Sequence, residues 1–188
     1  MQNYTALLVP GTTYHIYNRA NSNEKLFRET ENYLFFLKKY EAHVSPVMDT
    51  FCYCLMPNHF HFLVRTKQEE ALRQAFPKFE TLERLLSKRL SNFFSSYTQA
   101  FNKQQNRMGS LFMKNFKRKK ITDATYLNNI IRYIHLNPVH ANLCKHPEEW
   151  PHSSYSEILS DSQTFLMKEE LISWFNDLEN FKLFHNER

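Results

Sequence analysis

The chain has 188 residues, with 24 lysines and arginines against 19 acidic residues and a formal net charge of +5. This length fits one domain with modest extensions better than two full domains. No apolar run approaches the ~20 residues that cross a bilayer, and the first residues lack the pattern of a secretory signal, so we expect a cytoplasmic protein. With Gly11 and Gly109 as the only glycines, glycine-rich phosphate loops are excluded.

The first part of the chain predicts an alternation of strands and one helix. Residues 13–18 alternate and are β-branched or aromatic, which is typical of a strand. Thr30 is a good N-cap for a helix over residues 31–43. The apolar stripe of this helix would consist of Tyr33, Leu34, Leu37 and Tyr40. Residues 50–55 and 59–65 predict two further strands, separated by a proline-asparagine break.

A long helical region is predicted over residues 69–103, with an interruption near Pro77. Residues 110–122 indicate a strand or a basic hairpin, and residues 162–188 a further amphipathic segment. The apolar stripe of the long region would consist of Leu82, Leu85, Leu86, Leu90, Phe93, Phe94 and Tyr97.

A last major helix is predicted over residues 124–136, with Asp123 as its N-cap. We expect it to end there because Asn137 precedes Pro138, and a residue before proline is pushed out of the α region. The resulting order, β-α-β-β-α-β-α, predicts an α+β fold with a ferredoxin-like antiparallel sheet and helices packed on it.

The triplet His59-Phe60-His61 lies in the predicted strand 59–65. Strand side chains repeat every two residues, so both imidazoles project from one face and Phe60 from the other. Two histidines fixed in this way can act as a rigid pair of ligands for one metal ion. The alternative is a pair of surface histidines on an edge strand.

Tyr133 and Asn137 are spaced i, i+4 and therefore lie one turn apart on the same edge of their helix. If the helix packs near the histidine strand, the Asn137 amide oxygen completes the metal site. The Tyr133 hydroxyl then faces a phosphate held by the metal. The alternative is that Tyr133 is an interfacial tyrosine and Asn137 a helix C-cap.

Both motifs resemble those of one protein family. Residues 56–64 resemble the HUH signature (histidine-hydrophobic-histidine) of single-tyrosine transposases from insertion sequences. Residues 133–139 resemble the tyrosine helix of that superfamily, especially in the REP-associated tyrosine transposases. Weaker similarities follow the order of the family, at residues 14–19, 109–112, 116–117 and 150–155.

The resemblance implies a catalytic domain over residues 1–160, with its HUH motif on a central strand, and a C-terminal helical extension over residues 161–188 packed on it. His59, His61 and Asn137 would hold one divalent cation, Mg²⁺ or Mn²⁺, acting as a Lewis acid on the scissile phosphate. Tyr133 would attack single-stranded DNA, leaving a 5′-phosphotyrosine and a free 3′-hydroxyl. The 3′-hydroxyl of a second strand could then attack the phosphotyrosine and rejoin the DNA without ATP, because the covalent bond conserves the phosphodiester energy.

The resemblance also implies a hairpin-forming single-stranded DNA as partner and a nucleoid-associated location. Candidates for gripping the hairpin stem or a flanking strand are Arg19, Lys114, Lys117, Arg118, Lys119 and Lys120. A solvated charged face is the alternative for the basic run. Phe112 and Phe116 are predicted to be core residues rather than base-stacking residues.

The sequence departs from the family at two positions. Met113 stands where many relatives carry a polar residue, often glutamine, which bears on a local DNA contact. His140 replaces a common arginine or lysine, which bears on a phosphate contact.

Two other functions fit the same residues. The first is a domesticated, non-catalytic protein that binds DNA hairpins. The second is a metal-dependent nuclease in which water attacks and Tyr133 is structural. Both a monomer and a homodimer are compatible with the family, and the C-terminal tail favours the monomer.

Overall fold

The computed structural model describes residues 6–186. Its middle layer is a four-stranded antiparallel sheet in the order β2-β3-β1-β4. The strands are β1 (Thr13–Arg19), β2 (Met48–Met56), β3 (His59–Thr66) and β4 (Lys117–Lys120). The predicted α+β class with a ferredoxin-like sheet is confirmed, and the histidine strand β3 is one of the two central strands.

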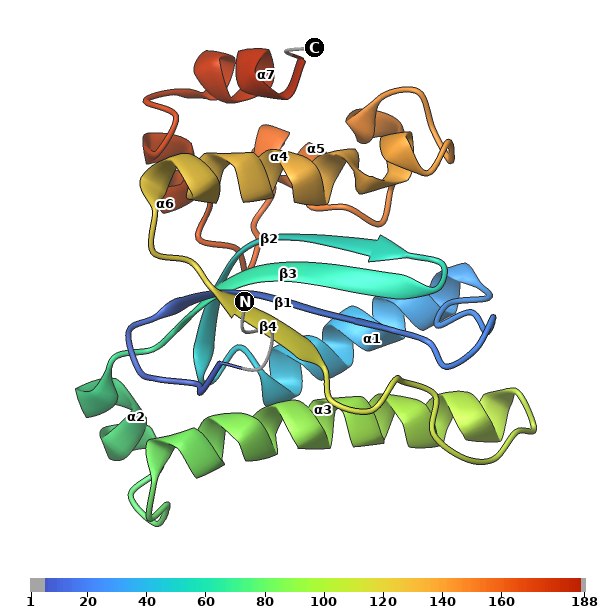
Figure 1. Ribbon diagram of the computed structural model, residues 1–188. Coiled ribbons are helices and arrows are strands. Elements are labelled where there is room, and N and C mark those ends of the chain that lie inside the picture. The colour runs from blue at the N-terminus through green and yellow to red at the C-terminus, as the bar shows by residue number, and fades with distance from the viewer. Residues whose placement is uncertain (1–5, 187–188) are drawn as a thin grey trace.

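Helices cover both faces of the sheet (Figure 1). One face carries α1 (Thr30–His43) and α3 (Leu82–Gln104), and the short α2 (Glu69–Ala75) precedes α3. The other face carries α4 (Ala124–His140). The chain then continues through a 3₁₀ turn and three short helices, whose bounds are Pro147–Glu149, Tyr155–Leu159 (α5), Lys168–Ser173 (α6) and Leu178–Asn186 (α7). None of the helices within residues 6–186 is long and apolar enough to span a membrane.

A layer of buried aromatic rings joins the sheet to α1 and α3. Phe36 lies 5.3 Å from Phe60 and 4.7 Å from Phe93 between ring centroids, and Tyr40 stacks on Phe62 at 4.1 Å. Burying each such side chain contributes roughly 1.5–3 kcal/mol. Because Phe60 and Phe62 are committed to this layer, the alternate residues of β3 must face α4.

Two predictions about α1 are wrong. The helix begins one residue early, so its N-cap is Glu29 and Thr30 lies inside it. Leu34 is 63% exposed, whereas Phe36 is fully buried. The buried face of the helix includes Asn32, whose side-chain oxygen accepts from the backbone N–H groups of Arg28 and Glu29.

The predicted end of α4 before Pro138 is also wrong. The helix begins after its predicted N-cap, Asp123, and continues to His140 with Pro138 inside it. A proline near the end of a helix removes one N–H donor, and Pro138 is itself buried, so packing offsets that loss. Asn137 is consequently a helical residue and not the C-cap, a position taken by Ala141.

The strands β1, β2 and β3 are each slightly longer than predicted, whereas two other expected elements are divided or shortened. The long helical region is split into α2 and α3 around Pro77, as expected. Within residues 110–122 only Lys117–Lys120 form a strand, and Phe112 makes an isolated bridge to Ala20.

The C-terminal segment lies on the α4 side and contacts the sheet edge. Leu166 bridges to Thr50, and the backbone N–H of Met167 donates to the Thr50 carbonyl at 2.8 Å. The side chains of Leu171 and Phe181 are buried. Residues 187–188 of the expected extension and residues 1–5 of the expected domain lie outside the described residues.

A buried chain of polar groups connects α7, α4 and β2. The Phe181 carbonyl can only accept, so His185 Nδ1 donates to it at 2.8 Å. His135 Nδ1 lies 2.9 Å from His185 Nε2, and His135 Nε2 lies 2.9 Å from the Ser154 hydroxyl oxygen, which also donates to the Tyr53 carbonyl at 3.1 Å. The Ser154 oxygen in turn accepts from the backbone N–H of Tyr53. Burial of both rings favours their neutral forms, because it lowers the pKa of each.

We predict that stability falls in mild acid because of this chain. Burial lowers the pKa of His185 from 6.5 to about 4, and that of His135 well below its usual value. Between these pH values the unfolded state binds more protons, so the stabilisation is complete above pH 6.5 and is lost as the pH falls towards 4. The loss for His185 is on the order of 3 kcal/mol, measurable by urea unfolding across this pH range.

His185→Asn removes the titrating ring but keeps a donor for the Phe181 carbonyl, so its unfolding free energy should vary less steeply with pH. The matched control is His140→Asn, which replaces an exposed histidine of α4 and should keep the wild-type slope. Equal slopes for wild type and His185→Asn would contradict the neutral buried chain.

Candidate active site

Four side chains from two neighbouring strands face α4. The pleat of β3 directs His59 and His61 to this face, and the pleat of β1 directs His15 and Tyr17 to it. Tyr17 lies directly opposite His61 in the antiparallel register. The histidine triplet thus lies on a central strand under a helix, and the edge-strand alternative is wrong.

His61 is held by His15. His61 Nδ1 and His15 Nε2 are 2.8 Å apart, and the two side chains are only 4% and 5% exposed. Burial, assisted by Lys119, lowers the pKa of His15 to about 3. Burial, assisted by His15, also lowers the pKa of His61 well below its usual value. Both rings are therefore neutral at pH 7, and this bond uses the Nδ1 side of His61, which leaves Nε2 for a ligand.

His59 faces Asn137 across the sheet–helix gap. His59 Nδ1 lies 2.7 Å from the Asn58 side-chain oxygen, so Nδ1 carries the hydrogen and Nε2 carries a lone pair. Asn137 uses its amide N–H to donate to the Tyr133 carbonyl, which turns its oxygen towards His59. His59 Nε2 and Asn137 Oδ1 are then two lone-pair atoms that face each other at 3.4 Å.

This donor set fits a divalent cation. Two ligand atoms that each lie ~2.1 Å from a metal at a right angle are about 3 Å apart, which is close to the 3.4 Å observed. The imidazoles are neutral, as metal ligands must be. Within residues 6–186 no group of three histidine, cysteine or acidic side chains could hold a metal, so an amide oxygen would have to supply the third ligand.

Tyr133 lies on α4 at the mouth of the site. Its side chain is 43% exposed, and its ring lies edge-on to His61 with centroids 5.4 Å apart. A cleft of about 400 Å³ separates α4 from the strands. Its lining includes His15, Tyr17, His61, Lys119, Tyr126 and Tyr133, and no acidic side chain of the described residues takes part. A phosphate could enter this cleft without charge repulsion, and the Lys119 ammonium would attract it.

The predicted DNA-binding cations are divided between the two faces of the sheet. β4 pairs with β1, so Lys117 and Lys119 share the face of Tyr17 and His15. Arg118 and Lys120 share the opposite face. Lys119 lines the cleft, with its ammonium 4.0 Å from the Tyr126 ring centroid.

The remaining candidates do not line the cleft, although Arg19 lies directly opposite His59 in the strand register. Arg19 and Lys114 are exposed, whereas the Arg118 guanidinium donates to the Ala6 carbonyl and lies over the Phe116 ring at 5.0 Å. Phe112 is buried, as predicted for a core residue, whereas Phe116 is only half-buried.

Sequence reasoning missed His15, Tyr17 and Tyr126. The alternation that singled out the two histidines of β3 applies equally to β1 and would have placed His15 and Tyr17 on one face. Tyr126 precedes Tyr133 by seven residues, and this spacing puts both rings on one face of α4.

A histidine pair on a central strand, facing a helical tyrosine and asparagine, is the arrangement that the HUH class of proteins would present. No family model matches the sequence. The chain is 25% identical over 156 residues to a candidate REP-associated tyrosine transposase of Haemophilus influenzae, covering 81% of this chain and 77% of that protein. The predicted resemblance to REP-associated tyrosine transposases is thereby confirmed.

The fold is also that of a solved structure. A REP-associated tyrosine transposase bound to a REP hairpin superimposes with a TM-score of 0.63, covering 86% of this chain and 87% of the other. Sequence identity in this comparison is 15%, so the likeness concerns the fold.

We predict different costs for replacing two neighbours in the site. Tyr133→Phe should change the free energy of unfolding by less than about 0.5 kcal/mol, because it removes only the hydroxyl of a side chain that is 43% exposed. His61→Ala should cost about 1–3 kcal/mol, because it leaves the buried Nε2 of His15 without its partner. Urea denaturation measures both. Equal stabilities would mean that the His15–His61 bond does not hold the site.

Proposed function

We propose that the protein cleaves and rejoins single-stranded DNA through a 5′-phosphotyrosine intermediate, and that it recognises hairpin DNA. The observation that carries the proposal is that His61 and Tyr133 line one cleft, in which no acidic side chain of the described residues takes part, while His59 faces Asn137 on the same side of the sheet. The similarity to REP-associated tyrosine transposases supports the reaction, and the hairpin in the related solved structure supports the substrate.

Tyr133 is the proposed nucleophile. Its hydroxyl oxygen attacks the phosphorus, a P–O bond to tyrosine forms, and the bond from phosphorus to the 3′ oxygen breaks. The tyrosine proton is lost, and the leaving 3′ oxygen gains a proton to become a hydroxyl. Attack on the phosphotyrosine by a 3′-hydroxyl reverses these steps, so strands are rejoined without an external energy source.

The surrounding residues prepare this step. A free tyrosine with a pKa of ~10 is a weak nucleophile at neutral pH, so positive charge near the phosphate must help. Lys119 supplies such a charge in the cleft. His59, His61 and Asn137 would hold a divalent cation, which when bound would supply Lewis-acid stabilisation of the phosphate charge. The helix fixes the backbone position from which the Tyr133 side chain reaches the cleft.

We predict that the wild-type protein forms a covalent adduct with DNA and that Tyr133→Phe abolishes it. The assay uses labelled hairpin oligonucleotides from the DNA flanking the gene, with Mn²⁺ or Mg²⁺, and a denaturing gel. Tyr126→Phe is the matched control, because it removes a hydroxyl from the same face of α4 and should leave adduct formation intact.

Other outcomes would select one of the alternative functions. Cleavage that leaves a free 5′-phosphate, unaffected by Tyr133→Phe, would establish a nuclease in which water attacks. Tight hairpin binding without adduct or cleavage would establish a non-catalytic hairpin-binding protein.

We predict that the cation depends on Asn137. Asn137→Leu removes the oxygen ligand and should weaken Mn²⁺ binding, measured by calorimetry without DNA, by at least about tenfold. Asn137→Asp retains an oxygen and adds charge, so it should bind Mn²⁺ at least as tightly as the wild type. His140→Ala, at an exposed position on the same helix, should not change binding. Unaltered affinity in Asn137→Leu would remove Asn137 from the ligand set.

A further inference from the structure

Lys119 is the cation of β4 that lines the cleft beside Tyr133. It lies directly opposite His15 in the register of β1 and β4, on the face that α4 covers. Its side chain is half-buried, whereas Lys117 and Lys120 are exposed. Its positive charge also reaches His15, where it adds to burial in lowering the pKa of that ring. Lys119 is therefore placed inside the site and not only on the surface of the strand.

The Tyr126 ring holds the Lys119 ammonium. The ammonium nitrogen lies 4.0 Å from the ring centroid, where the negative face of the aromatic ring attracts a cation. The ring is itself fixed by the start of α4. The backbone N–H of Tyr126 donates to the side chain of Asp123, the N-cap residue, at 2.7 Å. The beginning of the helix therefore places the ring, and the ring places the ammonium.

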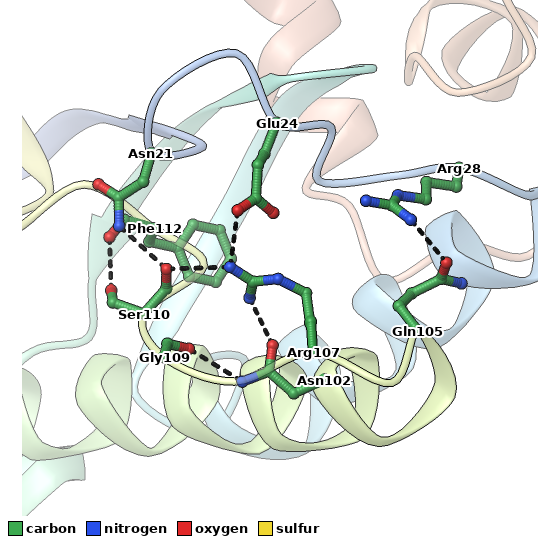
Figure 2. A network of polar contacts seen from close by, with 9 residues as sticks. All are labelled: Asn21, Glu24, Arg28, Asn102, Gln105, Arg107, Gly109, Ser110 and Phe112. Carbon is green, nitrogen blue, oxygen red and sulfur yellow. Dashed lines mark hydrogen bonds and ion pairs between the residues drawn. The ribbon is translucent and has the colours of Figure 1, made fainter.

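Lys119 has no polar partner that competes with the ring. Within residues 6–186 its ammonium forms neither an ion pair nor a hydrogen bond. By contrast, Arg28 lies over the Phe101 ring at 5.7 Å but also donates to Gln105 at 3.0 Å (Figure 2). A lysine ammonium is strongly hydrated and sits on a flexible stem. Without the Tyr126 ring, the side chain on this edge strand would turn out of the cleft into solvent.

We propose that Tyr126 is a positioning residue, whose ring holds the Lys119 ammonium where it meets the phosphate that Tyr133 attacks. The ring occupies one side of the ammonium, so the remaining N–H donors are left for phosphate oxygens. A cation that is in place before the substrate arrives needs no reorganisation as negative charge develops in the reaction. Tyr126 acts through its ring and not through its hydroxyl. The inference rests on the proposed function for the identity of the phosphate.

Helix α4 carries both the positioning ring and the proposed nucleophile. Tyr126 and Tyr133 are seven residues apart, which is about two helical turns, and both line the cleft. The Tyr133 ring lies 6.3 Å from the His15 ring between centroids, and His15 is the cross-strand neighbour of Lys119. The nucleophile and the cation thus reach the same part of the cleft. Because one helix sets both positions, Lys119 and Tyr133 keep their relative placement.

The contact itself is tested by NMR in the absence of DNA. In protein with ¹³C-labelled lysine, the aromatic ring should shift the ε-methylene protons of Lys119 upfield, and Lys119→Gln identifies the signal by its loss. Tyr126→Leu should remove the shift, and Tyr126→Phe should keep it. Lys39, whose ammonium lies 5.1 Å from the Phe35 ring centroid, provides an internal control that should not change. A Lys119 signal that is the same in Tyr126→Leu would overturn the proposal.

The consequence for the reaction is tested by a double-mutant cycle on the rate of adduct formation at saturating hairpin oligonucleotide. Tyr126→Leu should lower this rate about tenfold, and Lys119→Gln at least as much. The variant with both substitutions should be no slower than Lys119→Gln alone, because Tyr126 acts only through Lys119. Tyr126→Phe keeps the ring and should retain the wild-type rate. Lys39→Gln removes an equivalent charge outside the cleft and should not change the rate.

Three results would overturn the proposal: a wild-type rate in Tyr126→Leu, losses that multiply in the double variant, or a Tyr126→Phe protein as slow as Tyr126→Leu. If the wild type forms no adduct, the same cycle is measured on oligonucleotide binding. Coupling between Tyr126 and Lys119 in binding would then support the held cation and overturn the tyrosine chemistry. Independent effects on binding would overturn both.

Discussion

The antiparallel register of β1 is the constraint on which the site depends. β1 pairs with β3 on one side and with β4 on the other, which brings Tyr17 opposite His61 and His15 opposite Lys119. A slip of one residue would turn every side chain of a strand to the other face. The aromatic layer between the sheet and α1 and α3 prevents this slip. A slip would expose buried rings such as Phe60 to solvent, and their burial would be lost.

The second requirement is a fixed position for α4 above the sheet. Ile131 and Ile134 are fully buried beneath it, and His135 belongs to the polar chain that reaches α7 and β2. These contacts lie on the side of the helix away from solvent, so Tyr133 is left exposed on a helix that cannot rotate. Tyr133, the proposed nucleophile, can thus move only through its own side-chain torsions, while the histidines are held by their strand.

Periodicity in the sequence was sufficient for the parts of the site that belong to one element. The two-residue repeat put His59 and His61 on one face, and the i, i+4 spacing put Tyr133 and Asn137 on one helical edge. The end of α4 was mispredicted because local rules for proline do not include the burial of Pro138. The His15–His61 bond depends on a contact between segments that are distant in the sequence, and no spacing along the chain encodes it.

The composition of β4 affects whether copies of the protein aggregate with one another. β4 is the last strand of the sheet, and such a strand offers unpaired backbone groups to the edge of any other chain. Its four residues are all lysine or arginine, and like charges on two copies repel before their edges can pair. The same cations thus protect the sheet from edge-to-edge aggregation. Replacing all four by neutral residues would lower both the solubility of the protein and its attraction for a polyanion. Only single substitutions could therefore distinguish the contribution of each residue to solubility from its contribution to polyanion binding.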